Sequence, residues 1–233
     1  MLTVVIPCYN EAEGVPRIEA ELFPVLESLD GPCQVIAVND GSDDATGRLL
    51  AEAASRRRDM RVLSHHENRG LGAALRTGLS AADGDWLVFL DADLTFHPRH
   101  IPALVRAQRD SGADCVSGSP SLSGAPGVPL ARRLPSLALN AFYRGLFDRR
   151  LTSYTPMFRL YRTAALRAVP LRSDGFEISV EILVGLLRAG RRVIEIPVPL
   201  TVRGTGESKL RRWRELANHA ALAWRLLRPK PPY

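Results

Sequence analysis

Hydrophobic stretches and helical repeats alternate along the first half of the chain. Short apolar runs indicate strands buried on both faces, and between them apolar residues recur every three or four positions, as on one face of a helix. The predicted strands are 2–7, 34–39, 60–65 and 86–90, and the predicted helices are 13–29, 45–57 and 70–82. This strict alternation predicts an α/β fold with a doubly wound, mostly parallel sheet.

The second half is less regular. Its pattern predicts helices at 101–111, 134–147 and 177–189, a short helix near Ala164, and strands at 114–117, 154–161 and 192–202. Prolines interrupt the last strand, which places it at an edge of the sheet, and prolines and glycines in 118–129 predict a loop. We expect one domain over 1–210, with halves 1–117 and 118–210, followed by a basic amphipathic helix and tail at 211–233.

Two carboxylates, Asp91 and Asp93, follow strand 86–90 and are separated only by Ala92. Like charges this close disfavour each other unless a cation lies between them, and carboxylate oxygens suit Mg²⁺ or Mn²⁺. This pattern favours a metal site at the carboxyl edge of the sheet. A solvated loop that happens to carry two acids is the alternative.

Polar clusters also follow two other predicted strands, at 8–11 and 40–42. Ligands of doubly wound sheets bind at the carboxyl ends of the strands, so we expect these clusters and the two aspartates to share one site. The glycine-rich phosphate loops G-x-G-x-x-G and G-x-x-x-x-G-K-[ST] are both absent from the sequence. A nucleotide would therefore be held by acids and a metal.

Composition is ordinary for one globular domain, with 233 residues of which 45% are hydrophobic and 24% charged. No apolar run approaches the roughly 18 residues of a membrane span, and the N-terminus lacks the charged segment of a signal peptide, so we expect a soluble, cytoplasmic protein. Three scattered cysteines suggest neither disulfides nor a zinc site.

The net charge of +6 is concentrated at the C-terminus. From Arg203 onward there are 8 basic and 2 acidic residues, whereas positions 1–202 carry 23 of each. Because no nucleic-acid-binding motif accompanies this charge, it favours a phosphate-bearing ligand or an anionic membrane surface. Within the predicted C-terminal helix one face carries an apolar stripe, which could lie on a membrane or pack against the protein's own core: Trp213, Leu216, Ala217, Ala220, Trp224 and Leu227.

These motifs, in this order, resemble glycosyltransferase family 2 of the GT-A fold, and specifically its dolichol-phosphate mannose synthase-like branch. The resemblance covers nearly the whole chain. It rests on the segments VVIPCYNE at 4–11, VNDGSDD at 38–44, NRGLG at 68–72, FLDAD at 89–93, FR at 158–159, GF at 175–176 with Glu181, and R-x-x-G-E-S-K at 203–209.

The resemblance implies a sugar-nucleotide donor, a GDP- or UDP-hexose, with Mg²⁺ or Mn²⁺ held by Asp91 and Asp93. It assigns the donor site to Pro7, Tyr9, Asn10, Glu11, Asp40, Gly70, Asp91, Ala92 and Asp93. The other interpretations are core packing for Tyr9 and a helix cap for Asp40. In this scheme residues 1–117 are the donor-binding half and 118–210 the acceptor half.

For the acceptor, the resemblance points to Arg132, Ser136, Arg159 and Ser208, and for catalysis to Asp93, Glu181, Arg203 and Lys209. Arg132, Ser136 and Asn140 have the spacing of one helix face, which is also typical of a polar surface. Glu177 and Glu181 are likewise one turn apart and could share a cleft, although a salt bridge to an arginine would equally explain Glu181.

Several positions depart from the family pattern. Thr95 stands where a glutamine is usual, Asn39 replaces the first acid of the "DDGS" motif, and Pro120 replaces the arginine expected at the acceptor phosphate. The segment 153–159 lacks the usual aspartate and glycine. The donor half is thus nearly intact, whereas the acceptor half has diverged.

The predicted function is inverting, metal-dependent transfer of one hexose, mannose or glucose, from a nucleotide-diphosphate sugar to a polyprenyl or dolichyl phosphate, with peripheral contact to the cytoplasmic face of the membrane. The alternatives are transfer to a hydroxyl of a non-lipid acceptor, which would need Glu181 or Glu177 as a base, and an inactive donor-binding partner subunit. A sugar nucleotidyltransferase would carry a glycine-rich signature after the first strand, where this chain has Pro7-Cys8-Tyr9-Asn10.

Overall fold

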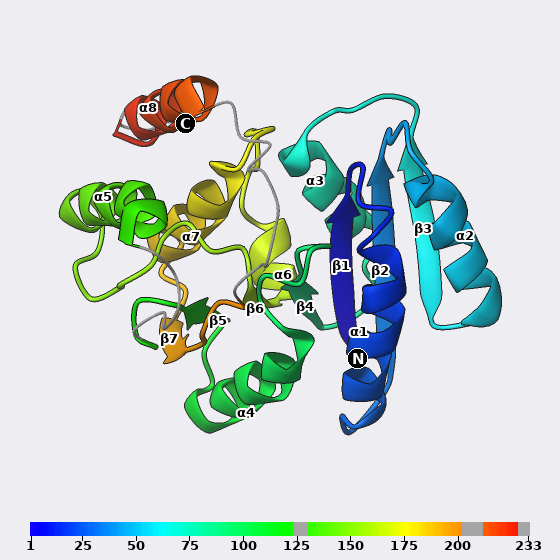
Figure 1. The fold of residues 1–233 in the computed structure, drawn as a ribbon. Coiled ribbons are helices and arrows are strands. Elements are labelled where there is room, and N and C mark those ends of the chain that lie inside the picture. Colours follow the sequence, from blue (N-terminus) through cyan, green and yellow to red (C-terminus); the bar gives the residue numbers. More distant parts are fainter. Residues whose placement is uncertain (124–129, 202–211, 228–233) are drawn as a thin grey trace.

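The computed structural model describes residues 1–123, 130–201 and 212–227. They form a single seven-stranded sheet with the strand order β3-β2-β1-β4-β6-β5-β7, covered by helices on both faces (Figure 1). The strands are β1 (Leu2–Cys8), β2 (Cys33–Asp40), β3 (Met60–His65), β4 (Trp86–Phe89), β5 (Cys115–Ser119), β6 (Arg159–Arg162) and β7 (Val193–Pro197).

The helices connect the strands much as predicted. They are α1 (Val15–Glu27), α2 (Thr46–Arg56), α3 (Leu71–Ala81), the short 3₁₀ helix η1 (Pro98–His100), α4 (Ile101–Ser111), α5 (Leu130–Leu146), α6 (Thr163–Arg167), α7 (Ile178–Arg188) and α8 (Arg212–Leu227). Helix α5 begins four residues before the predicted helix at 134–147.

The first half of the sheet is parallel, as predicted. Strand β1 pairs with β2 from Leu2↔Cys33 to Cys8↔Asn39, and with β4 from Leu2↔Trp86 to Val5↔Phe89, while β2 pairs with β3. Their buried apolar side chains exclude water from both faces of the sheet. The carboxyl ends of four strands therefore meet at one edge.

Strand β6 is the one antiparallel member of the sheet in the described part of the chain, and it lies between β4 and β5. The prediction of a strand over 154–161 is therefore wrong in extent. Pro156 lacks a backbone N–H for a sheet, and the N–H groups of Tyr154 and Thr155 donate to the Asn140 side chain, so this stretch is not a strand. Strand β7 lies at the sheet edge, as its prolines predicted.

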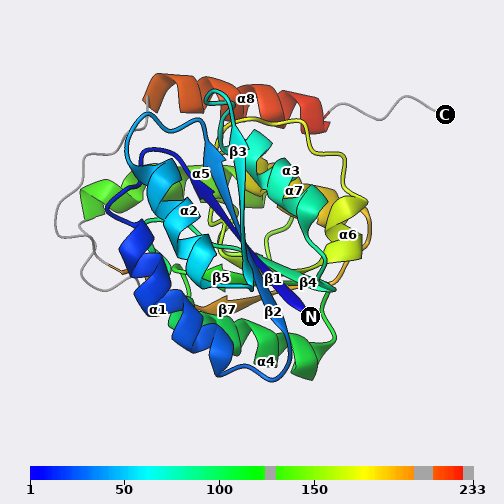
Figure 2. The ribbon, with the colours of Figure 1, turned by 90° about the vertical axis from the view of Figure 1, so that its right-hand side faces the viewer.

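Two apolar layers fill the space between sheet and helices. One packs α1, α2 and α4 against one face, and the other packs α3, α6 and α7 against the opposite face (Figure 2). A third cluster joins α5, α7 and α8 around Tyr143, Tyr154, Leu183 and Leu222. Helix α8 is thus docked on the rest of the chain.

Candidate active site

The loop after β1 is tied to the loop after β2 by reciprocal hydrogen bonds. The Asn10 N–H donates to the Ser42 hydroxyl (3.0 Å), and the Asp43 N–H donates to the Asn10 side-chain oxygen (2.9 Å). The Glu11 N–H donates to the hydroxyl of Thr46 (2.8 Å). These bonds hold the two loops together, and Asn10 does so with a φ of 52°, a backbone conformation that is uncommon outside glycine.

Tyr9 is exposed at this edge. Its side chain and backbone together retain 38% of their accessible surface, so the alternative of core packing is wrong. Pro7 precedes it in β1 and is half-buried. An exposed aromatic ring on a loop fixed by hydrogen bonds can stack on the flat face of a nucleobase.

Asp40 lies behind the site surface and is buried, with 3% of its surface exposed. Its carboxylate accepts hydrogen bonds from the N–H groups of Arg69 (3.0 Å) and Gly70 (2.9 Å) and from His65 Nδ1 (2.6 Å). His65 Nε2 in turn shares a hydrogen bond with the Thr77 hydroxyl (2.9 Å). Asp40 therefore holds the start of α3, not the helix that follows it in the sequence, and its predicted contact with a nucleoside stays a prediction.

Sequence reasoning did not single out His65. It is the last residue of β3 and pairs with Asp40 of β2. The rule that polar residues at the carboxyl ends of parallel strands form the site would therefore have identified it. At the start of α2 it is the Asp44 carboxylate that accepts the Thr46 N–H (2.9 Å), and the N-cap residue Ala45 provides no side-chain hydrogen bond.

The loop after β4 makes a tight turn that carries Asp91 and Asp93. The Leu94 N–H donates to the Asp91 carbonyl (3.0 Å), the Thr95 N–H to the Asp93 carboxylate (2.8 Å), and Arg17 to the Asp93 carbonyl (3.3 Å). Leu94 adopts a φ of 54° although it is 1% exposed. Ala92 is packed under the turn, where a Cβ on Gly14 would come within 2.7 Å of its carbonyl oxygen.

The two aspartates fit a metal that is shared with a ligand. Both are partly exposed, and both offer the oxygen donors that Mg²⁺ and Mn²⁺ prefer. The described residues contain no group of three or more His, Cys, Asp or Glu side chains placed for a metal. The protein would thus supply one or two carboxylates, and the remaining ligands would come from phosphates and water, which is the usual pattern for Mg²⁺.

The predicted acceptor residues fall in different places. Arg159 has no exposed surface, and it donates to the Ser117 hydroxyl (3.0 Å), the Ser179 carbonyl (2.8 Å) and the Tyr154 carbonyl (2.7 Å). The structure therefore places Arg159 in the core, where no acceptor can touch it. Ser136 is exposed on α5. Asn140, predicted on the same face, is buried and supports 154–155.

Glu177, which immediately precedes α7, and Glu181 of α7 do not share an open cleft, because they are only 6% and 4% exposed. Glu181 accepts the N–H groups of Arg172 (3.0 Å) and Ser173 (2.8 Å) and forms an ion pair with Arg225 of α8 (2.6 Å). Glu177 accepts the Gly175 N–H (3.3 Å). The alternative of a salt bridge for Glu181 is confirmed, and its catalytic role stays a prediction.

Four predicted residues cannot be placed in this site. Arg203, Ser208 and Lys209 lie outside the described residues, and the side chain of Arg132 lies outside the described side chains.

Comparison with known proteins decides the family. The model of the family "Glycosyl transferase family 2" matches residues 3–169. The chain belongs to glycosyl transferase family 2. As predicted, it falls in the dolichol-phosphate mannose synthase-like branch and is a glycosyltransferase.

Two curated relatives of this family member illustrate the branch. The chain is 34% identical to an undecaprenyl-phosphate mannosyltransferase of Micrococcus luteus, over 88% of this chain and 86% of that protein. It is 32% identical to an undecaprenyl-phosphate 4-deoxy-4-formamido-L-arabinose transferase of Salmonella choleraesuis, over 89% of this chain but only 62% of the longer protein.

Solved structures confirm the GT-A fold of this family 2 member. Glucosyl-3-phosphoglycerate synthase from Mycobacterium tuberculosis, in complex with Mn²⁺, UDP and phosphoglyceric acid, superposes with a TM-score of 0.71 at 21% identity, over 99% of this chain and 80% of that one. S. aureus TarS in complex with UDP-GlcNAc gives a TM-score of 0.65 at 18% identity, over 99% and 68%.

Proposed function

We propose that the protein transfers one hexose, with inversion, from a nucleotide-diphosphate sugar to a polyprenyl phosphate. The new bond joins an acceptor phosphate oxygen to C1 of the sugar, and the nucleoside diphosphate departs with the electron pair of the broken bond. The observation that carries the proposal is the convergence of the β1, β2, β3 and β4 carboxyl ends on one edge, with Tyr9, the Asp40-supported loop and the Asp91–Asp93 turn. The names of the two curated relatives support this acceptor class.

The donor would lie along this edge. Tyr9, with Pro7, Asn10 and Glu11, would line the nucleoside, and Asp91 and Asp93 would hold Mg²⁺ or Mn²⁺. The cation would neutralise charge that develops on the departing diphosphate. Complexes of Mn²⁺ with UDP in the M. tuberculosis enzyme support this arrangement.

The burial of Glu177 and Glu181 favours a phosphate acceptor over a hydroxyl acceptor. A hydroxyl needs a general base within hydrogen-bond reach, and Glu181 is already committed to Arg225 and two backbone N–H groups. A phosphomonoester is largely dianionic at neutral pH and needs no such base. Arg203 and Lys209, with Ser208 and Arg132, would supply positive charge and hydrogen bonds for the phosphates of donor and acceptor.

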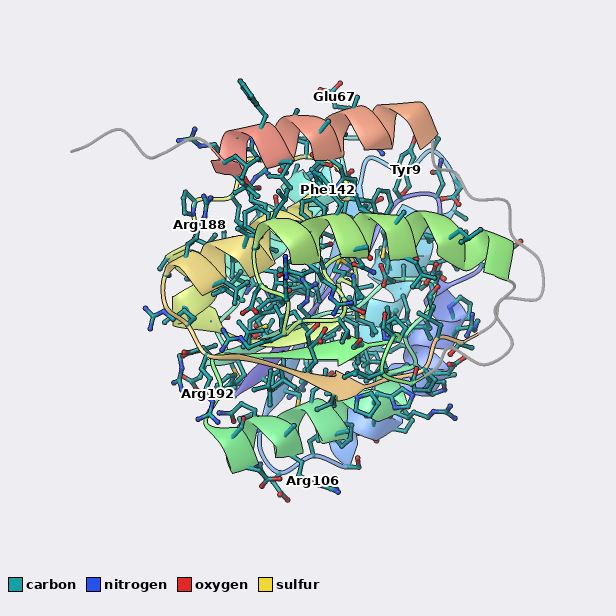
Figure 3. All side chains as sticks on the ribbon, turned by 90° about the vertical axis from the view of Figure 1, so that its left-hand side faces the viewer. Tyr9, Glu67, Arg106, Phe142, Arg188 and Arg192 are labelled. Carbon is teal, nitrogen blue, oxygen red and sulfur yellow. The ribbon has the colours of Figure 1, made fainter. Side chains whose placement is uncertain are left out.

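A lipid acceptor would be presented at a membrane surface, and α5 and α8 each carry exposed apolar side chains that could contact it. Figure 3 shows the two helices side by side, with Phe142 labelled. Leu134 and Phe142 of α5 are 55% and 47% exposed, and Trp224 and Leu227 of α8 are 64% and 54% exposed. The described helices contain none long and apolar enough to cross a membrane. We therefore propose peripheral contact, with basic residues of the tail facing anionic lipid.

The face of α8 that packs on the protein differs from the apolar stripe predicted from sequence. His219, Leu222, Ala223 and Leu226 are buried, whereas the described members of the stripe, including Trp224 and Leu227, are exposed. The interpretation that this stripe covers the protein's own core is therefore wrong for the described residues, and the membrane proposal gains support. Co-sedimentation with anionic vesicles at low salt should depend on Trp224, and equal recovery of wild type and Trp224→Ser in the supernatant would contradict it.

The test of the transferase proposal separates donor from acceptor. Isothermal titration with UDP and GDP in Mn²⁺ should reveal one preferred nucleotide, and a donor present at 100 times its Kd should stabilise the fold by about 2.7 kcal/mol. The preferred nucleotide sugar should then label undecaprenyl phosphate but not undecaprenol. Transfer to a hydroxyl acceptor alone would refute the phosphate acceptor, and binding of neither nucleotide would refute the donor site.

A further inference from the structure

The short segment 172–174, between α6 and α7, lies against the start of α3 (Figure 1). The Gly72 N–H donates to the Asp174 carbonyl (2.8 Å). Arg76 donates to the Ser173 carbonyl (2.5 Å) and forms an ion pair with the Asp174 carboxylate. The second half of the chain thus contacts the donor-binding half directly, through backbone groups.

Two glycines allow this close approach. A Cβ on Gly72 would lie 2.0 Å from the Ser173 carbonyl oxygen, and a Cβ on Gly70 would lie 2.5 Å from the Asp174 carbonyl oxygen. Gly70 also has a φ of 89°, which other residues rarely adopt. Because backbone rests on backbone here, a shift of 172–174 must be transmitted to 70–72.

The opposite side of 172–174 is held by Glu181 and Arg225. Glu181 accepts the N–H groups of Arg172 and Ser173, and Arg225 of α8 donates both to Glu181 (2.6 Å) and to the Ser173 hydroxyl (2.8 Å). The Glu181 side chain is 6% exposed and that of Arg225 is 41% exposed. A buried carboxylate with these donors fixes the segment in one position.

On the donor side, the residues that lead into α3 are held by Asp40 through the Arg69 and Gly70 N–H groups. An unbroken series of hydrogen bonds and packed backbone therefore leads from α8 through Arg225, Glu181 and 172–174 to Gly70 and Asp40.

We propose that Glu181 and Arg225 are positioning residues that set the donor-binding loop at 68–72 through 172–174, so that docking of α8 and binding of the nucleotide are coupled. The inference rests on the proposed function. Coupling of this kind is reciprocal: a nucleotide that binds the ordered loop also strengthens the docking of α8. Glu181 does not touch the substrate, and its effect reaches the donor through the backbone.

Arg225→Ala tests the coupling, and Arg188→Ala is the matched control. Arg188 also contacts α8, donating to the Leu226 carbonyl, but no contact of its side chain with 172–174 is found among the described residues. Titration with the preferred nucleotide diphosphate and Mn²⁺ should show a Kd raised at least fivefold in Arg225→Ala, unchanged in Arg188→Ala and partly restored in Arg225→Lys. Amide exchange of Gly70 and Gly72 should accelerate only in Arg225→Ala.

Glu181→Gln separates positioning from general-base catalysis. Positioning predicts a raised KM for the donor and a kcat within about fivefold of wild type at saturating donor, whereas loss of a base would lower kcat and leave nucleotide affinity unchanged. If wild type and Arg225→Ala bind the nucleotide with the same Kd, the proposed coupling is overturned and the proposed function is not. Wild type that binds neither UDP nor GDP would overturn the proposed function itself.

Discussion

Replacing Arg159 should damage stability and leave acceptor binding intact. Its guanidinium has no exposed surface and donates three hydrogen bonds of 2.7–3.0 Å, to Tyr154, Ser117 and Ser179. Arg159→Met removes all three and leaves buried acceptors without this donor, at about 1–3 kcal/mol per group. Relief of the buried charge offsets part of that cost. We expect a net loss near 3 kcal/mol, which for a domain of this size lowers Tm by about 6–12 °C.

The control is Arg162→Met, three residues along the same strand. Arg162 is 46% exposed and pairs with Asp114 at 2.9 Å, so its loss should cost about 1 kcal/mol or less. Thermal melts compare the two variants, and transfer assays below both Tm values give KM for the polyprenyl phosphate. The reasoning is refuted if the Tm of Arg159→Met equals that of Arg162→Met while the KM of Arg159→Met for the acceptor rises tenfold or more. Such a result would restore the acceptor role predicted from the sequence.

Three further predictions concern the metal, the tail and α8. Asp93→Ala should lower transfer at saturating Mn²⁺ by about 10³-fold or more with an unchanged far-UV spectrum, because a main charge-stabilising element is lost; near wild-type turnover would remove the metal assignment. Nucleotide diphosphate with Mn²⁺ should slow tryptic cleavage after Lys209, and Lys209→Ala should lower turnover at saturating donor; no change in either would leave Lys209 without a phosphate role. Burial lowers the pKa of His219 below its usual value, against an opposing effect of Glu177, so the folded state favours the neutral ring and loses stability as pH falls below about 6.5. The Tm advantage of wild type over His219→Gln should therefore narrow between pH 7.5 and pH 5.5, and a constant difference would contradict this.

The parallel half of the fold could be predicted because its strands are buried on both faces. A strand such as β2 can be predicted from its unbroken apolar run, because Val35, Ile36, Ala37 and Val38 are all fully buried. Parallel pairing then brings the strand ends together without further information. The positions of Tyr9 and of the Asp91–Asp93 turn follow from this rule alone.

The second half could not be read in the same way, because long-range contacts decide it. The stretch 154–158 contains Tyr154, Met157 and Phe158, which suit a strand. The side chain of Asn140 on α5, however, accepts hydrogen bonds from the N–H groups of residues 154 and 155. The pair Glu181–Arg225 joins residues 44 positions apart, and no local pattern marks it. The buried face of α8 was likewise hidden, because a helix with apolar residues on two faces leaves open which one packs.

Backbone strain separates the carboxyl-end edge of the parallel strands from the rest of the described chain. Among the described residues other than glycine, only Asn10 and Leu94 have a positive φ, and they lie in the loops after β1 and β4. Such conformations cost on the order of 1–3 kcal/mol each and persist where the surroundings enforce them. At Asn10 the enforcing contacts are the hydrogen bonds to Ser42 and Asp43, and at Leu94 they are burial and the bond to the Asp91 carbonyl. The molecule thus maintains two strained turns on neighbouring strands at the edge where a metal and a diphosphate would have to be held in a fixed geometry before reaction, as electrostatic preorganisation requires.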